Sequence, residues 1–470
     1  MTSRPTLTLL ILLCLLFFAA LGNHELQGST EPRVAGIAME MHLHGDWVTP
    51  RLNGEPFLEK PPLSLWLDAG FMKLFGPTTW AVRLASALAG LFCVLGLYAV
   101  LRSLGRPVWV AWGAALLLAT MGSFWGNVRQ VGEDALLCLG VTLSLLAYLR
   151  ISQGGQARWW GLFAAGIAIA TLSKGVLGLA LPGVVIFAWL VADSLLHKRL
   201  RLGAWLKPAA ATLVGVLPLL VWLGFLYRDG GAGALADVLW ANSVGRFDGS
   251  FEAAGHFEPF YYYLAKLPEA FLPWNLLVYL GLWHFRKQWR ANPYLLFFSL
   301  WLLAQFALLT LASSKRTVYL MSLAPAAAVI AMEYLRLLRE RYGDRWPKAP
   351  RAAQGVLAVV ICSYLAVAVW VLPRQDAQQS FLPLTELIRS LEQDGKQVVL
   401  YTPSERLAGA GVFYSRSLLR ALQTEDQLNG YLLASADHVA VMERDDDPPA
   451  PLVVLHKVVV GERAYYFVVR

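Results

Sequence analysis

The sequence predicts an all-α polytopic membrane protein that ends in a small soluble α/β domain. Hydrophobic residues make up 57% of the 470-residue chain and charged residues 15%, whereas soluble domains average about 45–50% and about 25%. Uncharged apolar runs recur along the first 373 residues, for example at 84–100, 135–149 and 356–371. Because a helix needs roughly 20 apolar residues to cross a bilayer, we expect about 11–13 transmembrane helices.

The basic residues indicate how the chain is oriented. The net charge is +8, but most Lys and Arg residues lie in short loops between apolar runs, where they orient the protein. We therefore expect no nucleic-acid partner. When residues 1–4 are placed in the cytoplasm, nearly every second loop is basic, and the densest run is 336–351. The N-terminus is accordingly expected to be cytoplasmic.

We expect two domains, a transmembrane domain with long loops on the non-cytoplasmic side and a soluble domain after it. The transmembrane domain, 1–373, includes a long outer segment at 24–80 and a loop at 227–266. A tight turn at 173–175 separates two short apolar spans. The soluble domain, 374–470, follows the last span and is expected on the same outer side.

The C-terminal segment has the pattern of a small α/β domain. Residues 382–393 have helical spacing, and the acidic, proline-containing stretch 445–449 predicts a loop. The expected β-strands are 397–401, 438–442, 452–459 and 464–469.

A first group of polar residues begins an amphipathic helix expected to lie on the membrane surface. Thr30 is a good N-cap, and Pro32 lies in the first helical turn. Glu31 lies at the positive end of this helix. It either complements the helix dipole or has a role in a functional site.

A second group of charges lies at the ends of apolar runs. Pro61 and Pro62 hold the preceding Glu59-Lys60 pair in an extended conformation. This pair is either an interfacial ion pair or a binding site for a phosphate or a metal. Asp134 and Lys174 are likewise either charges that extend toward the interface or members of a site.

A third group lies in later outer loops. Arg246 and His256 fall in the long loop at 227–266, and Lys315-Arg316 lies between two spans. Two adjacent cations suggest a phosphate clamp, although a lone His is more often structural than a ligand.

These acids and bases are expected to converge at the outer water–lipid boundary. Carboxylates suit general-base or metal chemistry, and cations suit a phosphate group. A site of this kind that borders lipid fits a substrate with an apolar tail. The combination predicts a phosphoryl-linked transfer reaction.

Several short motifs occur together in one order along residues 20–340. They are TEPR at 30–33, GDW at 45–47, EKPPL at 59–63, SKG at 173–175 and SKR at 314–316. In this order they resemble the bacterial membrane glycosyltransferases of the GT-C fold. The groups that the chain is most similar to are the lipid A aminoarabinose transferases and their protein O-mannosyltransferase relatives.

The resemblance implies an inverting transfer of a sugar from a polyprenyl (undecaprenyl) phosphate to a lipid A-like or other envelope acceptor. It also implies a monomer in the bacterial inner membrane, with the site and the C-terminal domain in the periplasm. Besides its donor and its lipid or protein acceptor, such a protein contacts membrane lipids.

The resemblance also implies roles for individual residues. Lys60 and Arg246 would hold the donor phosphate, and Glu59 with His256 would hold a divalent, zinc-like metal. No other cofactor is implied. The other expected substrate-binding residues are Arg33, Lys174, Lys315, Arg316 and Tyr319.

One position departs from the family pattern. Thr30 stands where the family usually has a catalytic Asp, so Glu31 and Asp134 are the candidate replacements, and Thr30 itself stays a candidate catalytic residue.

Two other classes of function stay open. One is an inactive polyprenyl-phosphate binding or translocating protein, and the other is a secondary transporter, which would carry buried acids near the bilayer midplane.

Overall fold

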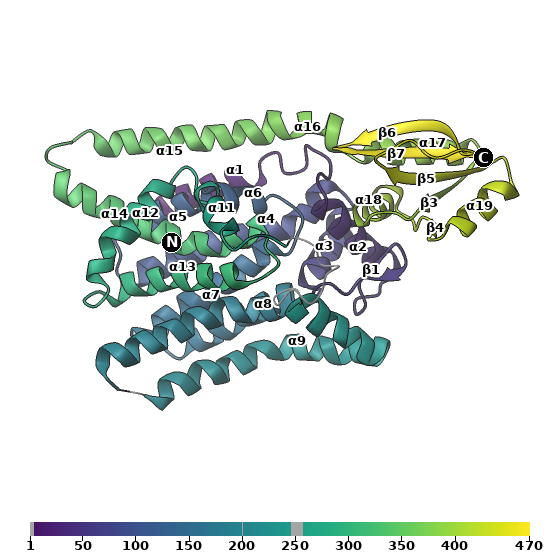
Figure 1. Ribbon diagram of the computed structural model, residues 1–470. Helices are drawn as coiled ribbons and strands as arrows, with labels where there is room; N and C mark the ends of the chain where they lie inside the picture. Colours follow the sequence, from purple (N-terminus) through teal and green to yellow (C-terminus); the bar gives the residue numbers. More distant parts are fainter. Residues whose placement is uncertain (1–3, 200, 246–256) are drawn as a thin grey trace. The chain divides into compact units, whose positions relative to one another are not determined.

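The computed structural model describes residues 4–199, 201–245 and 257–470, except for the side chains of 241–244. The predicted fold class is confirmed: helices make up most of the chain, and a small sheet lies near its C-terminal end (Figure 1). Within the described residues, seven helices are long and apolar enough to cross a membrane. They are Thr79–Ser103, Asp134–Ser152, Arg158–His197, Leu202–Trp240, Pro293–Leu311, Thr317–Tyr342 and Ala349–Gln379.

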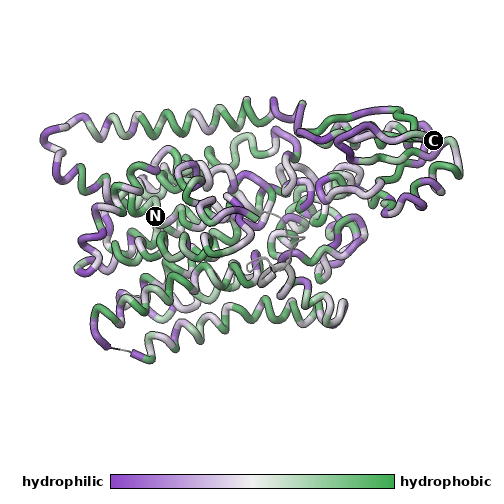
Figure 2. Tube along the Cα trace, viewed as in Figure 1, coloured by the Kyte–Doolittle hydropathy of each residue, from purple (hydrophilic) through white to green (hydrophobic). Residues whose placement is uncertain are grey.

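Figure 2 shows apolar residues concentrated along these long helices and hydrophilic residues at many of the turns. Shorter apolar helices also occur, including α1 (Arg4–Phe18) and α5 (Val108–Ala119). These are 15 and 12 residues long, shorter than the roughly 20 residues that cross a bilayer unaided. The chain is a multi-pass membrane protein.

The described chain forms two compact units. Unit 1 comprises residues 1–19, 58–63 and 86–365, and unit 2 comprises 20–57, 64–85 and 366–470. Helix α4 (Thr79–Ser103) begins in unit 2 and continues into unit 1.

Unit 1 is helical. In addition to α1, α5 and most of α4, its elements are α6 (Gly122–Asn127), α7 (Asp134–Ser152), α8 (Arg158–His197), α9 (Leu202–Ala236), η1 (Asp237–Val244), α11 (Tyr262–Ala270), α12 (Asn275–Phe285), η3 (Arg286–Gln288), α13 (Pro293–Leu311), η4 (Thr317–Leu323), α14 (Ala324–Tyr342) and α15 (Ala349–Ala366).

Helix α8 contains the predicted turn between two apolar spans. Lys174 and Gly175 have non-helical backbone angles, and Gly175 has a φ of 52°. A Cβ atom on Gly178 would lie 2.0 Å from the carbonyl oxygen of Ala170. In a continuous helix these two residues would be about 12 Å apart. The chain therefore reverses at Lys174–Gly175 and forms two antiparallel helical arms.

Small residues allow α7 to pack closely on the first arm of α8. A Cβ on Gly140 would lie 2.5 Å from the backbone nitrogen of Ala170, and one on Gly166 would lie 2.5 Å from that of Ser144. Such small-residue contacts are typical of helix packing in membranes, where the driving force is close van der Waals contact. This packing fixes the turn of α8 against the start of α7.

Unit 2 joins an early segment of the chain to its C-terminal domain. The early segment contains α2 (Thr30–His44), a hairpin of β1 (Arg51–Leu52) and β2 (Glu55–Pro56), and most of α3 (Leu63–Phe75). The C-terminal part begins with η5 (Val367–Val371) and α16 (Leu372–Gln379). The domain boundary predicted at 373/374 stays a prediction.

The C-terminal domain contains a five-stranded mixed sheet with the strand order β4-β3-β5-β7-β6. Strand β3 is parallel to β4 and β5, whereas β7 is antiparallel to β5 and β6. Leu400, Val441 and Phe467 are buried in its core. The elements are α17 (Leu382–Gln393), β3 (Gln397–Tyr401), α18 (Glu405–Ser415), β4 (Ala421–Leu422), α19 (Glu425–Ala434), β5 (His438–Arg444), β6 (Val453–Val460) and β7 (Arg463–Val469).

Two local expectations were wrong. The loop expected from residue 227 begins as helix, because α9 runs to Ala236 and η1 continues to Val244. The N-cap of α2 is Ser29, which makes no side-chain capping hydrogen bond, and Thr30 is the first helical residue.

Candidate active site

A cluster of buried and half-buried charges lies in unit 1. The Nζ atom of Lys60 lies 2.5 Å from Oε1 of Glu133 and 3.7 Å from Oε2 of Glu59. The Nζ atom of Lys174 lies 3.5 Å from the same Glu133 oxygen and also forms an ion pair with Asp134. Glu133 therefore bridges two lysines, and the cluster contains three carboxylates and two ammonium groups.

Solvent reaches the two lysines to different extents. The Lys60 side chain is 18% exposed, whereas Lys174 is 4% and Glu133 2% exposed. Attraction between opposite charges is strong in such a dry environment, and breaking a buried pair is costly. Lys60 is consequently the lysine that an incoming anion can reach, and Lys174 holds the two carboxylates of α7 in place.

Three separate turns position these side chains. Pro61 and Pro62 follow Lys60 and favour an extended chain. Glu133 and Asp134 lie at the N-terminal end of α7, where the helix dipole stabilises negative charge. Lys174 occupies the reversal in α8, which needs a glycine next to it because Gly175 has a positive φ.

The start of η4 adds aromatic and basic groups to this end of unit 1. The Lys174 ammonium lies 4.3 Å from the ring centre of Tyr319, a cation–π contact. The Tyr263 hydroxyl donates to the carbonyl oxygen of Arg316 at 3.2 Å and accepts from its backbone N–H at 3.1 Å. Lys315 donates to the carbonyl oxygen of Glu258 at 3.0 Å. These bonds fix the loop that carries both predicted cations.

Burial changes the proton affinity of two groups in this loop region. It lowers the pKa of Lys315, because the charged ammonium loses hydration, while nearby Glu258 opposes this shift. Burial also raises the pKa of Tyr263, so this hydroxyl stays protonated at neutral pH. Tyr263 is therefore a neutral hydrogen-bonding support for the loop.

The predicted residues near Thr30 belong to unit 2. The Glu31 carboxylate is buried and accepts two hydrogen bonds of 2.8 Å from the Arg83 guanidinium, together with one from the Gln27 N–H at 3.1 Å. Arg33 forms an ion pair of 2.8 Å with Glu405 and lies over the Phe57 ring. Thr30 is half-buried at the helix start.

The structure thus brings five predicted residues into direct contact with one another or with Glu133. They are Glu59, Lys60, Asp134, Lys174 and Tyr319. Arg246 and His256 lie outside the described residues. Among the described ranges, no group of three or more potential metal ligands is present, and Glu59, one of the two expected ligands, forms an ion pair with Lys60.

Sequence reasoning missed two important partners. Asp134 was considered from the sequence but the adjacent Glu133 was not, although an acidic pair directly before an apolar run was a signal for both. Arg83, which is fully buried, was not considered as a partner of Glu31. The signal was an arginine within the apolar stretch that begins α4.

Comparisons with known proteins match the part of the sequence that contains this cluster. The family model described as dolichyl-phosphate-mannose-protein mannosyltransferase matches residues 59–222, a segment that contains the Lys60, Glu133, Asp134 and Lys174 cluster.

Curated relatives are similar over most of the chain. The undecaprenyl phosphate-alpha-4-amino-4-deoxy-L-arabinose arabinosyl transferase of Pseudomonas paraeruginosa is 32% identical over 350 residues, which are 72% of this chain and 61% of that relative. The enzyme of the same name from Shewanella sediminis is 28% identical over 70% of this chain and 59% of the relative. The chain thus spans about three fifths of the length of these relatives.

Solved structures show the same fold. ArnT from Cupriavidus metallidurans, crystallised with undecaprenyl phosphate, superimposes with a TM-score of 0.73 at 21% identity, over 98% of this chain and 97% of ArnT. The apo oligosaccharyltransferase of Archaeoglobus fulgidus gives a TM-score of 0.53 at 13% identity, over 90% of this chain and 65% of that protein.

Fold and comparisons together define the class of protein. The chain is a multi-pass membrane protein with the GT-C fold. More narrowly, its resemblance to the glycosyltransferases that use polyprenyl-phosphate sugars, namely the aminoarabinose transferases and their mannosyltransferase relatives, is confirmed.

Proposed function

We propose that the chain is a membrane glycosyltransferase that moves a sugar from polyprenyl (undecaprenyl) phosphate to a lipid A-like or other envelope acceptor. The observation that carries this proposal is the cluster in which Lys60, whose side chain is partly exposed, shares Glu133 with the buried Lys174. The names of the relatives support the donor class, since they are undecaprenyl-phosphate sugar transferases.

Lys60 binds the phosphate of the donor. When the bond between the anomeric carbon and the phosphate oxygen breaks, the phosphate leaves with the bonding electron pair and gains negative charge. A nearby ammonium stabilises that charge in the transition state. Glu133 is still neutralised by Lys174 when Lys60 turns to the phosphate. Arg246, Lys315, Arg316 and Tyr319 are the proposed additional phosphate-binding groups, with Arg33 as a further helper.

Asp134 is the carboxylate that we assign to the acceptor. An acceptor oxygen attacks the anomeric carbon from the face opposite the phosphate, which inverts the configuration. If the acceptor is a hydroxyl, its proton passes to Asp134; if it is an ionised phosphate, only positioning is needed. Glu31 fits this role less well, because both of its oxygens accept hydrogen bonds from Arg83.

The orientation follows from the distribution of basic residues. We place the N-terminus in the cytoplasm of a bacterium and the cluster and the C-terminal domain on the periplasmic face of its inner membrane. In this arrangement, the chain works as a monomer in contact with membrane lipids.

Glu59 and His256 are proposed ligands of a divalent metal. A carboxylate and an imidazole are suitable zinc ligands, and a bound cation would provide further positive charge near the leaving phosphate. The test is the zinc content of the purified protein by elemental mass spectrometry. We expect zinc in the wild type and its loss in Glu59→Gln, while an equal metal content in both would contradict the assignment.

The second candidate function is a protein that binds or translocates polyprenyl phosphate without catalysis. It is favoured by Thr30 at the position of the family Asp and by the ion pair that occupies Glu31. The experiment that separates the two is mass spectrometry of envelope lipids and proteins from cells with and without the chain. Loss of a sugar modification with the deletion supports the transferase, and an unchanged set of glycans supports the binder.

A further inference from the structure

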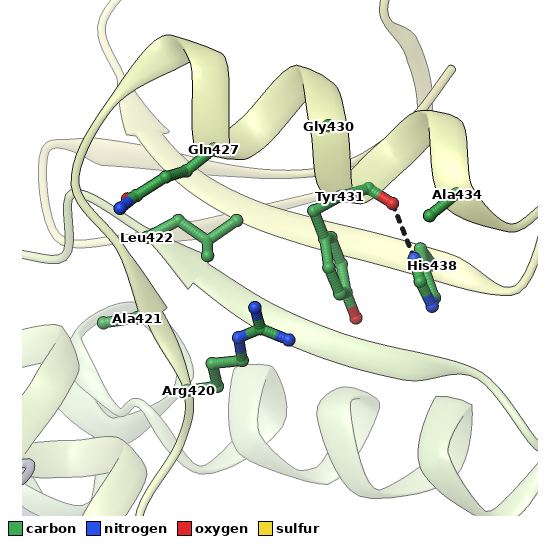
Figure 3. A pocket seen from close by; sticks show the side chains of 8 residues that line it. All are labelled: Arg420, Ala421, Leu422, Gln427, Gly430, Tyr431, Ala434 and His438. Atoms are coloured by element: carbon green, nitrogen blue, oxygen red, sulfur yellow. Dashed lines mark hydrogen bonds between the residues drawn. The ribbon is translucent and has the colours of Figure 1, made fainter.

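A cavity of about 430 Å³ lies in the C-terminal domain, between the edge strand β4 and helix α19 (Figure 3). Its size is typical of pockets for small molecules. The residues used below are Arg420, Leu422, Gln427, Tyr431 and His438, and none of the eight lining residues carries a carboxylate.

Three of these side chains form a fixed stack. The rings of Tyr431 and His438 are parallel, with centres 4.0 Å apart and an interplanar angle of 6°. The Arg420 guanidinium lies 5.4 Å from the Tyr431 ring centre. Tyr431 is buried, and its hydroxyl donates to the carbonyl oxygen of Gln397 at 2.8 Å. Arg420 is therefore held beside a rigid aromatic wall.

The hydrogen bonds that His438 and Gln427 already make show which of their polar atoms remain available to a ligand. Nδ1 of His438 lies 2.6 Å from the carbonyl oxygen of Tyr431. Because a carbonyl can only accept, Nδ1 carries a proton, and in this tautomer Nε2 is an acceptor. The Gln427 side-chain oxygen accepts from the backbone of Gln423, which leaves its amide NH₂ as a donor.

No acidic side chain among the eight lining residues competes with a ligand for the Arg420 guanidinium. No carboxylate in the described part of the chain forms an ion pair with Arg420, whereas the nearby Lys396 is paired with Asp437 at 2.8 Å. A guanidinium binds phosphate or carboxylate oxygens with two parallel hydrogen bonds. A site with a guanidinium and an amide as donors and one imidazole nitrogen as acceptor suits an anion that also carries hydroxyl groups.

We propose that this cavity binds a phosphorylated, hydroxyl-bearing ligand of the size of a sugar phosphate. Its phosphate is bound by Arg420 and Gln427, and one hydroxyl donates to Nε2 of His438. Leu422 contributes apolar contact to the carbon skeleton of the ligand. This binding site uses none of the residues assigned to sugar transfer.

The test uses the full chain in a neutral detergent and isothermal titration calorimetry with glucose 6-phosphate, with glucose as the uncharged comparison. We expect binding of the phosphate to be at least about tenfold weaker in Arg420→Gln, since a charged hydrogen-bonding partner is lost. Arg420→Lys keeps the charge without the planar fork and should give intermediate binding. Arg444→Gln, an exposed arginine on β5 outside the cavity, is the matched control and should bind as the wild type does.

A second arm separates a soluble ligand from a lipid headgroup. Phosphatidylcholine vesicles with and without phosphatidylinositol 4-phosphate present a phosphate monoester and sugar-like hydroxyl groups on a surface, and binding that depends on both phosphatidylinositol 4-phosphate and Arg420 assigns the site to a headgroup. Arg420-dependent binding in either arm supports the proposal. Absence of binding in both arms, equal binding by Arg420→Gln, or binding that Lys60→Ala removes would overturn it.

Discussion

Asp134 and Glu31 show how the surroundings of a carboxylate decide its role. Asp134 is 12% exposed and is paired with Lys174, which also has Glu133 as a partner. Glu31 is 5% exposed and is held by the fully buried Arg83. In our proposal Asp134 accepts a proton from the acceptor while Lys174 keeps Glu133 as its partner. A proton on Glu31 would leave the buried Arg83 charge without its ion pair.

For Asp134→Asn we expect kcat for a hydroxyl acceptor to fall by roughly 10²–10⁴, the usual contribution of a general base. The KM for the donor should change little, because Lys60 and Glu133 are unaltered. Steady-state kinetics in proteoliposomes measure both constants. Asp229→Asn, on the exposed end of α9, is the matched control. An unchanged kcat in Asp134→Asn would remove this residue from the reaction.

For Glu31→Gln we expect a loss of stability, because the buried Arg83 guanidinium loses the carboxylate with which it forms an ion pair. Breaking a buried ion pair in this way costs about 3–5 kcal/mol of unfolding free energy. The control is Glu405→Gln, which breaks the Arg33 pair at a half-exposed position and should cost about 0–1 kcal/mol. Denaturant unfolding in detergent measures both. A Glu31→Gln protein that is as stable as the wild type yet inactive would make Glu31 the catalytic base.

At the scale of elements, helix α2 joins the C-terminal domain through two glycines. A Cβ on Gly36 would lie 2.4 Å from the Cα atom of Gly409 in α18, and one on Gly409 would lie 2.4 Å from the carbonyl oxygen of Pro32. The backbones of the two helices are therefore in direct contact. Any larger residue at either position must separate them.

We expect Gly36→Val to destabilise unit 2 by at least about 1–3 kcal/mol, the typical cost of overpacking a close contact. Limited proteolysis should then cleave near α18 faster than in the wild type. Gly70→Ala in α3 has no atom within 4 Å of the added Cβ and is the matched control. Wild-type protease resistance of Gly36→Val would show that the α2–α18 contact does not hold the unit together.

The elements that could be predicted from the sequence are those with a clear local pattern, and an element that depends on packing between distant segments was missed. The strands 397–401 and 464–469 and the helix 382–393 have clear local periodicity, and each was predicted nearly to its observed bounds. Helix α18 was missed because its centre, Ala408 to Gly411, has two glycines and a low intrinsic helix propensity. It is stabilised by packing on α2, which a sequence does not reveal. Helix α19 did have a local signal, the capping box of Thr424 and Gln427.

In the candidate site, too, contacts between distant segments could not be predicted from the sequence. Pairs such as Glu59-Lys60 could be recognised as unusual because two prolines follow them. That Glu133 bridges Lys60 and Lys174 could not be predicted, since it requires three distant turns to meet. The pairing of Glu31 with Arg83 likewise depends on the approach of α2 to α4.

At the scale of the whole molecule, unit 1 has two charged ends joined by apolar helices. Tyr319 lies with Lys174 at one end. Glu333, paired with Arg106 and Arg336, lies further along the same 26-residue span, and at helical rise the separation of Tyr319 from Arg336 is roughly 25–30 Å. This is about the thickness of the bilayer core. Glu333 thus lies toward the basic end of a span, which does not match the midplane acid of a transporter.

We expect the C-terminal domain and the basic run 336–351 to face opposite sides of the membrane. In a background without native cysteines, a membrane-impermeant maleimide should label Ser417→Cys in intact spheroplasts. It should label Arg345→Cys only after permeabilisation, because the basic run 336–351 favours the cytoplasm. The reverse labelling pattern would contradict the periplasmic placement of the C-terminal domain.

We propose that the charge cluster around Glu133 binds the donor phosphate through Lys60. The most direct measurement is the rate of sugar transfer from the polyprenyl-phosphate donor by reconstituted wild type, Lys60→Ala and Lys73→Ala, an exposed lysine on α3. We predict that Lys60→Ala lowers this rate by about 10²–10³, the usual effect of removing one transition-state charge partner, in protein that stays folded, while Lys73→Ala keeps the wild-type rate. A folded Lys60→Ala protein that transfers sugar at the wild-type rate would contradict the account.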